Sequence, residues 1–183
     1  MIDFELTAEQ EELRRTLRSF VQKELLPEAG RWDRSGELPR QTWRKLGELG
    51  LLGCRTPAAY GGQEVDLLTI GLAVEEIGRG DVSCTYAVQA STLAGEIIAR
   101  HGGEEARARW LPPLARGEAI VALALTEPGA GSDAASIACR AVREGDGYVL
   151  TGEKSGISLG LVADAAIVYA STDLAARAHG ITA

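Results

Sequence analysis

The chain has 183 residues, of which 45% are hydrophobic and 25% are charged, and its formal net charge at pH 7 is -7. This composition is typical of a globular protein with a packed core, and the length suits one ordinary domain or two small ones. The negative charge argues against nucleic acid as the main partner, because a phosphate backbone would be repelled.

The N-terminal segment and the cysteines bear on location and on metal binding. The segment is acidic (MIDFELTAEQEEL), and no apolar run approaches the length of a membrane span, so we expect no signal peptide and no transmembrane helix. Cys54, Cys84 and Cys139 are widely spaced, and only two histidines are present. We therefore expect reduced, buried thiols, no metal site and a cytoplasmic location.

The first two-thirds of the chain has helical periodicity. Thr7 and Gln10 have the spacing of a capping box, and the apolar residues that follow recur at helical intervals until Pro27 interrupts them. Further helices are predicted for LPRQTWRKLGELG, for the segment that ends at GRGD, for VSCTYAVQASTLAGEIIARHG and for EEARARWLPPLARG. The third of these is mostly apolar, so we expect it to be central. Pro112 and Pro113 are expected to bend or end the last one.

After Gly117 the pattern changes to that of strands. AIVALAL, DAAIVYAST and HGITA have strand character. Within SIACRAVREGDGYVLTGEKSGI, EGDG has the composition of a hairpin turn, with Asp146-Gly147 as the turn pair. We predict a helical domain over residues 1–117 and the opening strands of a β-rich domain over residues 118–183. These few strands would leave sheet edges exposed, so we expect the sequence to stop inside a domain.

The stretch LTEPGAGSD, residues 125–133, is the candidate site. Gly129 and Gly131 are expected to allow backbone angles and close approach that other residues forbid. Ser132 and Asp133 then place short polar side chains beside exposed backbone N–H groups. Such a loop can donate hydrogen bonds to a flat, electron-rich ligand, although the same pattern is also typical of a turn that simply ends a strand.

Segments along the whole chain resemble the acyl-CoA dehydrogenase family. They have the family's order and spacing and comprise LGELGLLG, PAAYGG, VEEIGRGD, HGGEEARARWLPPLARGEAIVALALTEPGAGSD and LTGEKSGIS. The resemblance implies an α+β architecture with an N-terminal α-helical bundle, a β-barrel-like middle domain and a C-terminal helical domain. This chain would supply the first domain and the opening strands of the second.

The family resemblance also implies a reaction. Members bind FAD and oxidise an acyl-CoA thioester to the 2-enoyl-CoA: a carboxylate removes the α-proton, and the β-hydrogen leaves as hydride to the flavin. The implied partners are the acyl-CoA substrate, an electron-transferring flavoprotein and further copies of the chain, as a homotetramer or a dimer.

The same resemblance assigns roles by position. The backbone of Leu125 and the side chain of Thr126 would hydrogen-bond the isoalloxazine ring. Ser132, with the Gly131 backbone beside it, would face the FAD phosphates or the acyl-CoA substrate. The remaining cofactor contacts would come from Ile157 and Ser158, the latter near flavin N5. Within the motif, Glu127 and Asp133 are expected to be structural.

One position departs from the family pattern. Gly156 stands where the family usually has a tryptophan against the flavin, and Leu159 replaces a more usual polar residue. Either the glycine widens the site for a branched, cyclic or bulky acyl group, or another side chain fills the gap and specificity is unchanged. EKSGIS together with EEIGRGD resembles members that act on alicyclic acyl-CoAs.

No catalytic base is assigned to this chain. In most of the family it is a glutamate of the C-terminal helical domain, and Glu75, Glu76 and Glu96 match no such position, so we expect them to be structural. A protein that ended at Ala183 would bind little FAD and would not dehydrogenate its substrate. Two alternatives stay open: an acyl-CoA oxidase or flavin monooxygenase of the same fold, and a non-catalytic half-length partner subunit.

Overall fold

The computed structural model describes residues 5–183 as two compact units, the first extending to Ala119 and the second spanning Ile120–Ala183. Residues 1–4, which open the acidic N-terminal segment, lie outside the described residues. The domain limits inferred from the sequence, 1–117 and 118–183, remain a prediction. None of the helices within residues 5–183 is both long and apolar enough to cross a membrane.

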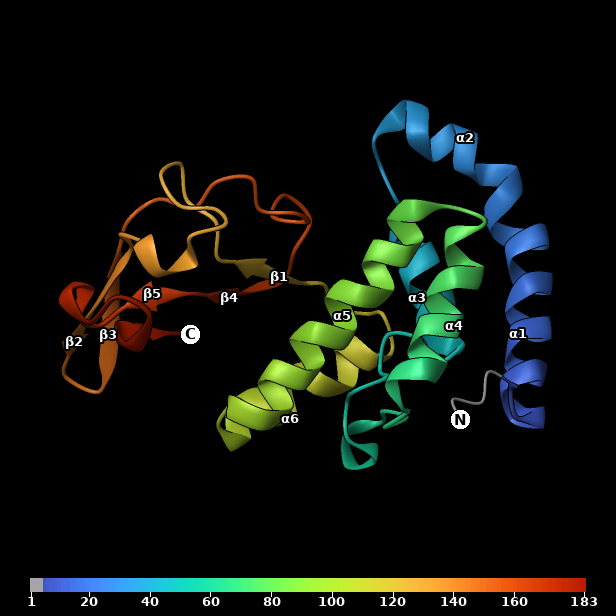
Figure 1. Cartoon of the computed structure of the whole chain (residues 1–183), viewed down its shortest axis with the longest axis horizontal. Helices are drawn as coiled ribbons and strands as arrows, with labels where there is room; N and C mark the ends of the chain where they lie inside the picture. The colour runs from blue at the N-terminus through green and yellow to red at the C-terminus, as the bar shows by residue number, and fades with distance from the viewer. Residues whose placement is uncertain (1–4) are drawn as a thin grey trace. The chain divides into compact units, whose positions relative to one another are not determined.

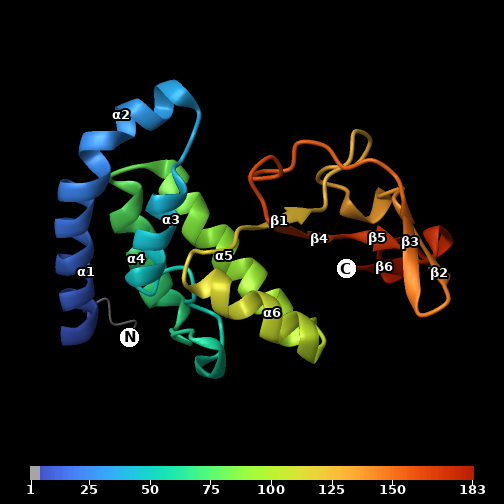
Figure 2. The ribbon, with the colours of Figure 1, turned by 180° about the vertical axis from the view of Figure 1, so that it is seen from behind.

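The first unit is helical (Figures 1 and 2). Its elements are α1 (Ala8–Phe20), a π-helical turn (Val21–Leu25), α2 (Leu26–Ser35), α3 (Arg40–Glu48), a 3-10 turn (Ala58–Tyr60), α4 (Leu67–Gly78), α5 (Val82–His101) and α6 (Glu104–Ala115). Helix α5 contacts α3, α4 and α6, which confirms the central place expected from its apolar sequence. The buried face of α5 includes Cys84, Val88 and Ala94.

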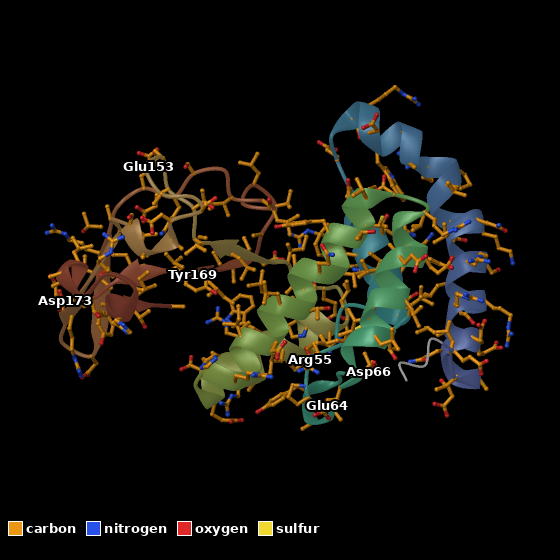
Figure 3. The ribbon with its side chains drawn as sticks, viewed as in Figure 1. Arg55, Glu64, Asp66, Glu153, Tyr169 and Asp173 are labelled. Atoms are coloured by element: carbon orange, nitrogen blue, oxygen red, sulfur yellow. The ribbon has the colours of Figure 1, made fainter. Side chains whose placement is uncertain are left out.

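Short polar side chains begin several of these helices. The Thr7 hydroxyl accepts a hydrogen bond from the Gln10 backbone at 3.2 Å, and the Gln10 side chain accepts one from the Thr7 backbone at 3.1 Å, so the predicted capping box is confirmed. Asp66, labelled in Figure 3, caps α4 because its carboxylate accepts from the backbone N–H groups of Leu68 and Thr69, and Asp81 caps α5 by accepting from Cys84 N–H. Each cap satisfies backbone N–H groups that the first helical turn leaves without partners.

Prolines interrupt the helices less than the sequence predicted. The chain stays helical past Pro27, because this residue lies in the first turn of α2, where no backbone N–H is needed. The α-helical pattern changes earlier, at the π-helical turn. Pro112 and Pro113 lie inside α6 rather than ending it. The neighbouring Leu111 and Leu114 are fully buried, and this packing offsets the lost hydrogen bonds.

The second unit consists of short strands and loops (Figure 2). Its strands are β1 (Val121–Ala124), β2 (Arg140–Glu144), β3 (Gly147–Thr151), β4 (Ala165–Val168), β5 (Ala170–Ser171) and β6 (Ile181–Thr182). Strand β1 pairs with β4 in parallel, while the other four form a sheet in the order β3-β2-β5-β6. Two 3-10 segments, Ala134–Ser136 and Leu174–Gly180, lie between them.

The hairpin of β2 and β3 forms at the predicted EGDG turn, but its two turn residues lie one position earlier than the predicted Asp146-Gly147 pair. Glu144 pairs with Gly147, which leaves Gly145 and Asp146 as the two-residue turn. Gly145 has a φ of 58°, the left-handed conformation that such turns require. Every residue of β3 is exposed, as expected for a strand at the edge of this sheet.

The cysteines are buried, as the sequence predicted. Cys54, Cys84 and Cys139 are free and each is at most 4% exposed. Burial raises the pKa of the Cys54 thiol to about 11 and that of Cys84 to about 12, so both thiols stay protonated at neutral pH. Cys139 belongs to the small core of the second unit, with Ala141 and Ala170.

Candidate functional site

The LTEPGAGSD segment leaves β1 and folds into a tight turn. The backbone N–H of Glu127 donates to the Ala130 carbonyl at 2.9 Å, and the Ala130 N–H donates back to the Glu127 carbonyl at 3.1 Å. Pro128 and Gly129 are the two central residues of this turn. Proline suits such a position because its φ is already fixed near the value that the turn needs.

The glycines of this segment do not have the special backbone angles that the sequence predicted. Neither Gly129 nor Gly131 has a positive φ, so the prediction of special backbone angles at these positions is wrong. A Cβ atom placed on either residue would meet no atom within 4 Å. The two glycines therefore leave an open surface, which is compatible with a ligand lying close to the backbone.

Glu127 lies at the centre of the hydrogen bonds that hold the turn. Its side chain is 6% exposed. One carboxylate oxygen accepts from the backbone N–H of Ala138 at 2.6 Å, and the other accepts from Cys139 N–H at 3.0 Å and from Lys154 Nζ at 2.8 Å. Burial acts to raise the pKa of Glu127, but these three donors outweigh it and hold the pKa below its usual value. The structural role expected for Glu127 agrees with this geometry.

Lys154 connects the turn to the loop that follows β3. Its ammonium group also donates to the Leu125 carbonyl at 2.9 Å, and the next residue, Ser155, donates its backbone N–H to the Thr126 carbonyl at 3.0 Å. The loop of residues 153–158 is thereby attached to the beginning of the LTEPGAGSD segment. Glu153, labelled in Figure 3, is exposed and lies next to Lys154 in this loop.

Several backbone N–H groups and hydroxyls at these positions have no hydrogen-bond partner among the described residues. Within residues 5–183, no hydrogen bond uses the backbone N–H of Leu125 or Thr126, or the Thr126 hydroxyl. The hydroxyls of Ser132 and Ser158 likewise have no hydrogen-bond partner among the described residues, and both side chains are exposed. Such a set of open donors suits a ring that carries carbonyl oxygens and unprotonated nitrogens.

The structure joins only some of the residues expected at the site. Leu125 and Thr126 are tied to the 153–158 loop through Lys154 and Ser155, and Ile157 and Ser158 follow in the same loop. No hydrogen bond within residues 5–183 joins Gly131 or Ser132 to that loop. Gly131 and Ser132 follow the turn in the sequence, and both residues are exposed.

Asp133 contacts neighbouring polar groups instead of a buried partner. Its carboxylate accepts a hydrogen bond from the Ser136 hydroxyl, which holds the pKa of Asp133 below its usual value, and Arg177 Nη2 lies 3.4 Å away. All of these contacts are exposed, and they stabilise the chain just after the turn.

Gly156 has a backbone conformation that favours glycine. Its φ is 61°, in the left-handed region that L side chains rarely adopt, and no atom lies within 4 Å of a Cβ placed there. Leu159, three residues later, has a φ of 66°, which is unusual for a leucine. The absence of an aromatic side chain is therefore built into the local backbone.

Lys154 is the residue that sequence reasoning missed. It lies inside the LTGEKSGIS segment, but its partner Glu127 is 27 residues away in the sequence. A lysine in a polar loop normally extends into water, and only the buried carboxylate explains why this one does not.

Comparison with known proteins identifies the family. The family model described as acyl-CoA dehydrogenase, N-terminal domain, matches residues 7–118, and the model of the acyl-CoA dehydrogenase middle domain matches residues 122–183. The chain belongs to the acyl-CoA dehydrogenase family. The site described above lies within the part of this family member that matches the middle domain.

Relatives of this acyl-CoA dehydrogenase family member are similar along most of its length. Mitochondrial isovaleryl-CoA dehydrogenase from Pongo abelii is 42% identical over 184 residues, which are 97% of this chain and 43% of the relative. The structure of a glutaryl-CoA dehydrogenase with glutaryl-CoA has a TM-score of 0.93 at 34% identity, covering 98% of this chain and 47% of its own. The structure of PigA with FAD and proline has a TM-score of 0.91 at 28% identity, covering 98% and 48%. The chain thus spans less than half the length of these relatives.

Proposed function

We propose that these residues are part of an FAD-dependent enzyme that oxidises an acyl-CoA thioester to the 2-enoyl-CoA. The observation that carries the proposal is the set of open donors on Leu125, Thr126 and Ser158, in a chain that belongs to the acyl-CoA dehydrogenase family. The structural relative with FAD supports the choice of cofactor. FAD, when bound, supplies the capacity to accept hydride.

The residues of the second unit would bind and orient that cofactor. The N–H of Leu125 and the N–H and hydroxyl of Thr126 are available to the pyrimidine side of the ring, where donors stabilise growing negative charge. Ser158, beside Ile157, would donate near N5. Gly131 and Ser132 would face the phosphates or the acyl-CoA, since their surface is open and polar.

We assign no proton-abstracting carboxylate to the 183 residues. Glu76 and Glu96 are already paired with arginines in the helical unit, so they are poor candidates for a base. In this proposal the carboxylate belongs to a part of the protein beyond these residues, and the present residues contribute the cofactor contacts.

Gly156 supports a choice of substrate class within this proposal. The left-handed backbone and the open space at this residue favour the interpretation that the site is wider here, and therefore a branched or alicyclic acyl group. The isovaleryl-CoA relative, which acts on a branched acyl group, is compatible with that choice. An electron-transferring flavoprotein as oxidant, a homotetrameric or dimeric assembly and a cytoplasmic location are further parts of the proposal.

Replacement of Thr126 tests the cofactor contact. In the full chain encoded by the gene, Thr126→Val should weaken FAD binding about fivefold to tenfold, because one hydrogen bond to the ring is lost. Quenching of flavin fluorescence on binding measures this affinity. Thr151→Val is the control, since Thr151 is also an exposed threonine of the second unit. Equal affinities for all three proteins, or no FAD binding by the unaltered chain, would contradict the proposal.

A second candidate function is an oxygen-using flavoenzyme of the same fold. The similarity to the prolyl acyl carrier protein oxidase AnaB, with a TM-score of 0.88 at 34% identity, is the observation in its favour. Production of hydrogen peroxide during turnover, in the absence of any electron-transferring flavoprotein, would support this candidate. Turnover that requires an added electron acceptor would support the dehydrogenase.

A further inference from the structure

Lys154 is an ammonium group that is largely withdrawn from water. Its side chain is 12% exposed, and its two hydrogen bonds go to the Leu125 carbonyl at 2.9 Å and to the Glu127 carboxylate at 2.8 Å. An unpaired charge at such a depth would be strongly unfavourable, so Lys154 depends on Glu127. Glu127 is itself held by the backbone N–H groups of Ala138 and Cys139.

This arrangement determines which backbone groups of Leu125 and Thr126 are available. Lys154 occupies the Leu125 carbonyl, and Ser155 N–H occupies the Thr126 carbonyl. Both backbone carbonyls of the segment therefore accept a hydrogen bond, whereas its two N–H groups and the Thr126 hydroxyl have no partner within residues 5–183. The segment therefore presents two N–H donors and a hydroxyl that can donate or accept, which suits a ligand edge that carries acceptors.

The ion pair of Lys154 and Glu127 holds the segment of Leu125 and Thr126 without adding net charge. Glu127 compensates the ammonium group of Lys154 at 2.8 Å. Because the pKa of Glu127 lies below its usual value, its carboxylate is ionised at neutral pH and can compensate the cation. A neutral side chain of similar length at position 154 would release the Leu125 carbonyl and leave the Glu127 carboxylate without its cation.

We propose that Lys154, held in place by Glu127, is a positioning residue that fixes Leu125 and Thr126 for their contact with the flavin ring. The inference rests on the proposed function, because it concerns the same cofactor contact. Lys154 does not touch the ring itself. It acts by holding the Leu125 carbonyl, and the Ser155 bond beside it holds the Thr126 carbonyl, so that the donors stay directed away from the loop.

A double-mutant cycle on the full chain tests this inference. The four proteins are the unaltered chain, Lys154→Met, Thr126→Val and the double variant. Two quantities are measured for each: the dissociation constant for FAD, from fluorescence quenching, and the midpoint of thermal unfolding of the flavin-free protein. Glu153→Gln serves as the matched control, because it changes a charge on the neighbouring, exposed residue.

The inference predicts coupling in cofactor binding but not in stability. Lys154→Met should weaken FAD binding about tenfold or more, and Thr126→Val should then add less than about a twofold further loss, because the hydroxyl is no longer positioned. The changes in the unfolding midpoint should be additive, since the exposed Thr126 hydroxyl makes no hydrogen bond within the described residues. Glu153→Gln should leave the FAD affinity unchanged.

Different outcomes would contradict the inference alone or the proposed function on which it rests. If the unaltered chain binds FAD and the losses from the two substitutions multiply, Lys154 has only a structural role and the inference fails alone. If the unaltered chain does not bind FAD, the proposed function fails as well. Should Lys154→Met not fold, Lys154→Arg takes its place in the cycle. Arginine retains the charge but not the single-point geometry, and the same non-additive loss is expected.

Discussion

Glu127 shows at the residue scale how a carboxylate becomes structural. It is buried, it accepts two backbone hydrogen bonds, and it pairs with Lys154. The acceptor positions of both oxygens are thus largely satisfied within the fold. Such a carboxylate is poorly suited to remove a proton from a substrate, because its pKa is lowered instead of raised toward neutrality.

The lowered pKa of Glu127 gives a signed prediction for acid stability. Its stabilising contribution is fully present above the usual glutamate value of 4.5 and is lost as the pH falls through the lower, folded-state value. Glu127→Gln should cost about 3 kcal/mol at pH 7, and the cost should shrink progressively below about pH 4. Urea unfolding at pH 7, 5, 4 and 3 measures this difference. A cost that stays constant over that range would contradict the account.

Gly156 is a residue whose type is set by its backbone. Gly156→Ala should destabilise the protein by about 1 kcal/mol, because a Cβ is unfavourable at a φ of 61° even where space is open. Gly129→Ala is the matched control, since that position is equally open but has no positive φ. Its effect should stay within about 0.5 kcal/mol. Equal effects of the two substitutions in chemical unfolding would refute the backbone explanation.

At the scale of elements, an ion pair connects α1 to α4. Glu76 has a side chain only 3% exposed, and its carboxylate accepts from Arg18 at 2.5 and 3.1 Å. The hydrogen bond from Arg18 lowers the pKa of Glu76 despite its burial. Sequence reasoning expected a structural role for this residue, and the ion pair is compatible with it. The partner in α1 lies 58 residues away and could not be named from the sequence.

Removing this connection should destabilise the helical unit. Glu76→Gln is expected to cost about 2 kcal/mol, because a hydrogen-bonded charge pair is lost at a nearly buried position. Glu12→Gln is the control: Glu12 pairs with Arg15 at the surface, and such a pair contributes less than about 0.5 kcal/mol. Thermal unfolding distinguishes the two. If both variants unfold at the same temperature, the pair between α1 and α4 adds no more than a surface contact.

Local chemistry explains which elements were predictable from the sequence. The capping box at Thr7 and the hairpin turn at Gly145 depend on residues a few positions apart, so their patterns could be read directly. The continuation of α6 through Pro112 could not be predicted from the sequence, because it depends on burial against other helices. Lys154 was missed for the same reason: its role depends on a carboxylate that only the fold brings near.

At the scale of the molecule, the family is established and the activity is a proposal about a larger protein. The two family models match residues 7–118 and 122–183, yet the chain covers only 43% of its isovaleryl-CoA dehydrogenase relative. In the proposal, the residues described here contribute the cofactor contacts, and Gly156 bears on the choice of acyl group. No residue among the 183 is assigned as the proton-abstracting group of the proposed reaction.

The most direct test of the central claim is an anaerobic titration of the full, flavin-loaded chain with isovaleryl-CoA and with cyclohexanecarboxyl-CoA, followed by visible absorbance and by mass spectrometry of the thioester. The account predicts that at least one of these substrates bleaches the flavin bands and becomes a product lighter by two hydrogens. A flavin that remains fully oxidised, with both thioesters unchanged, would contradict the account.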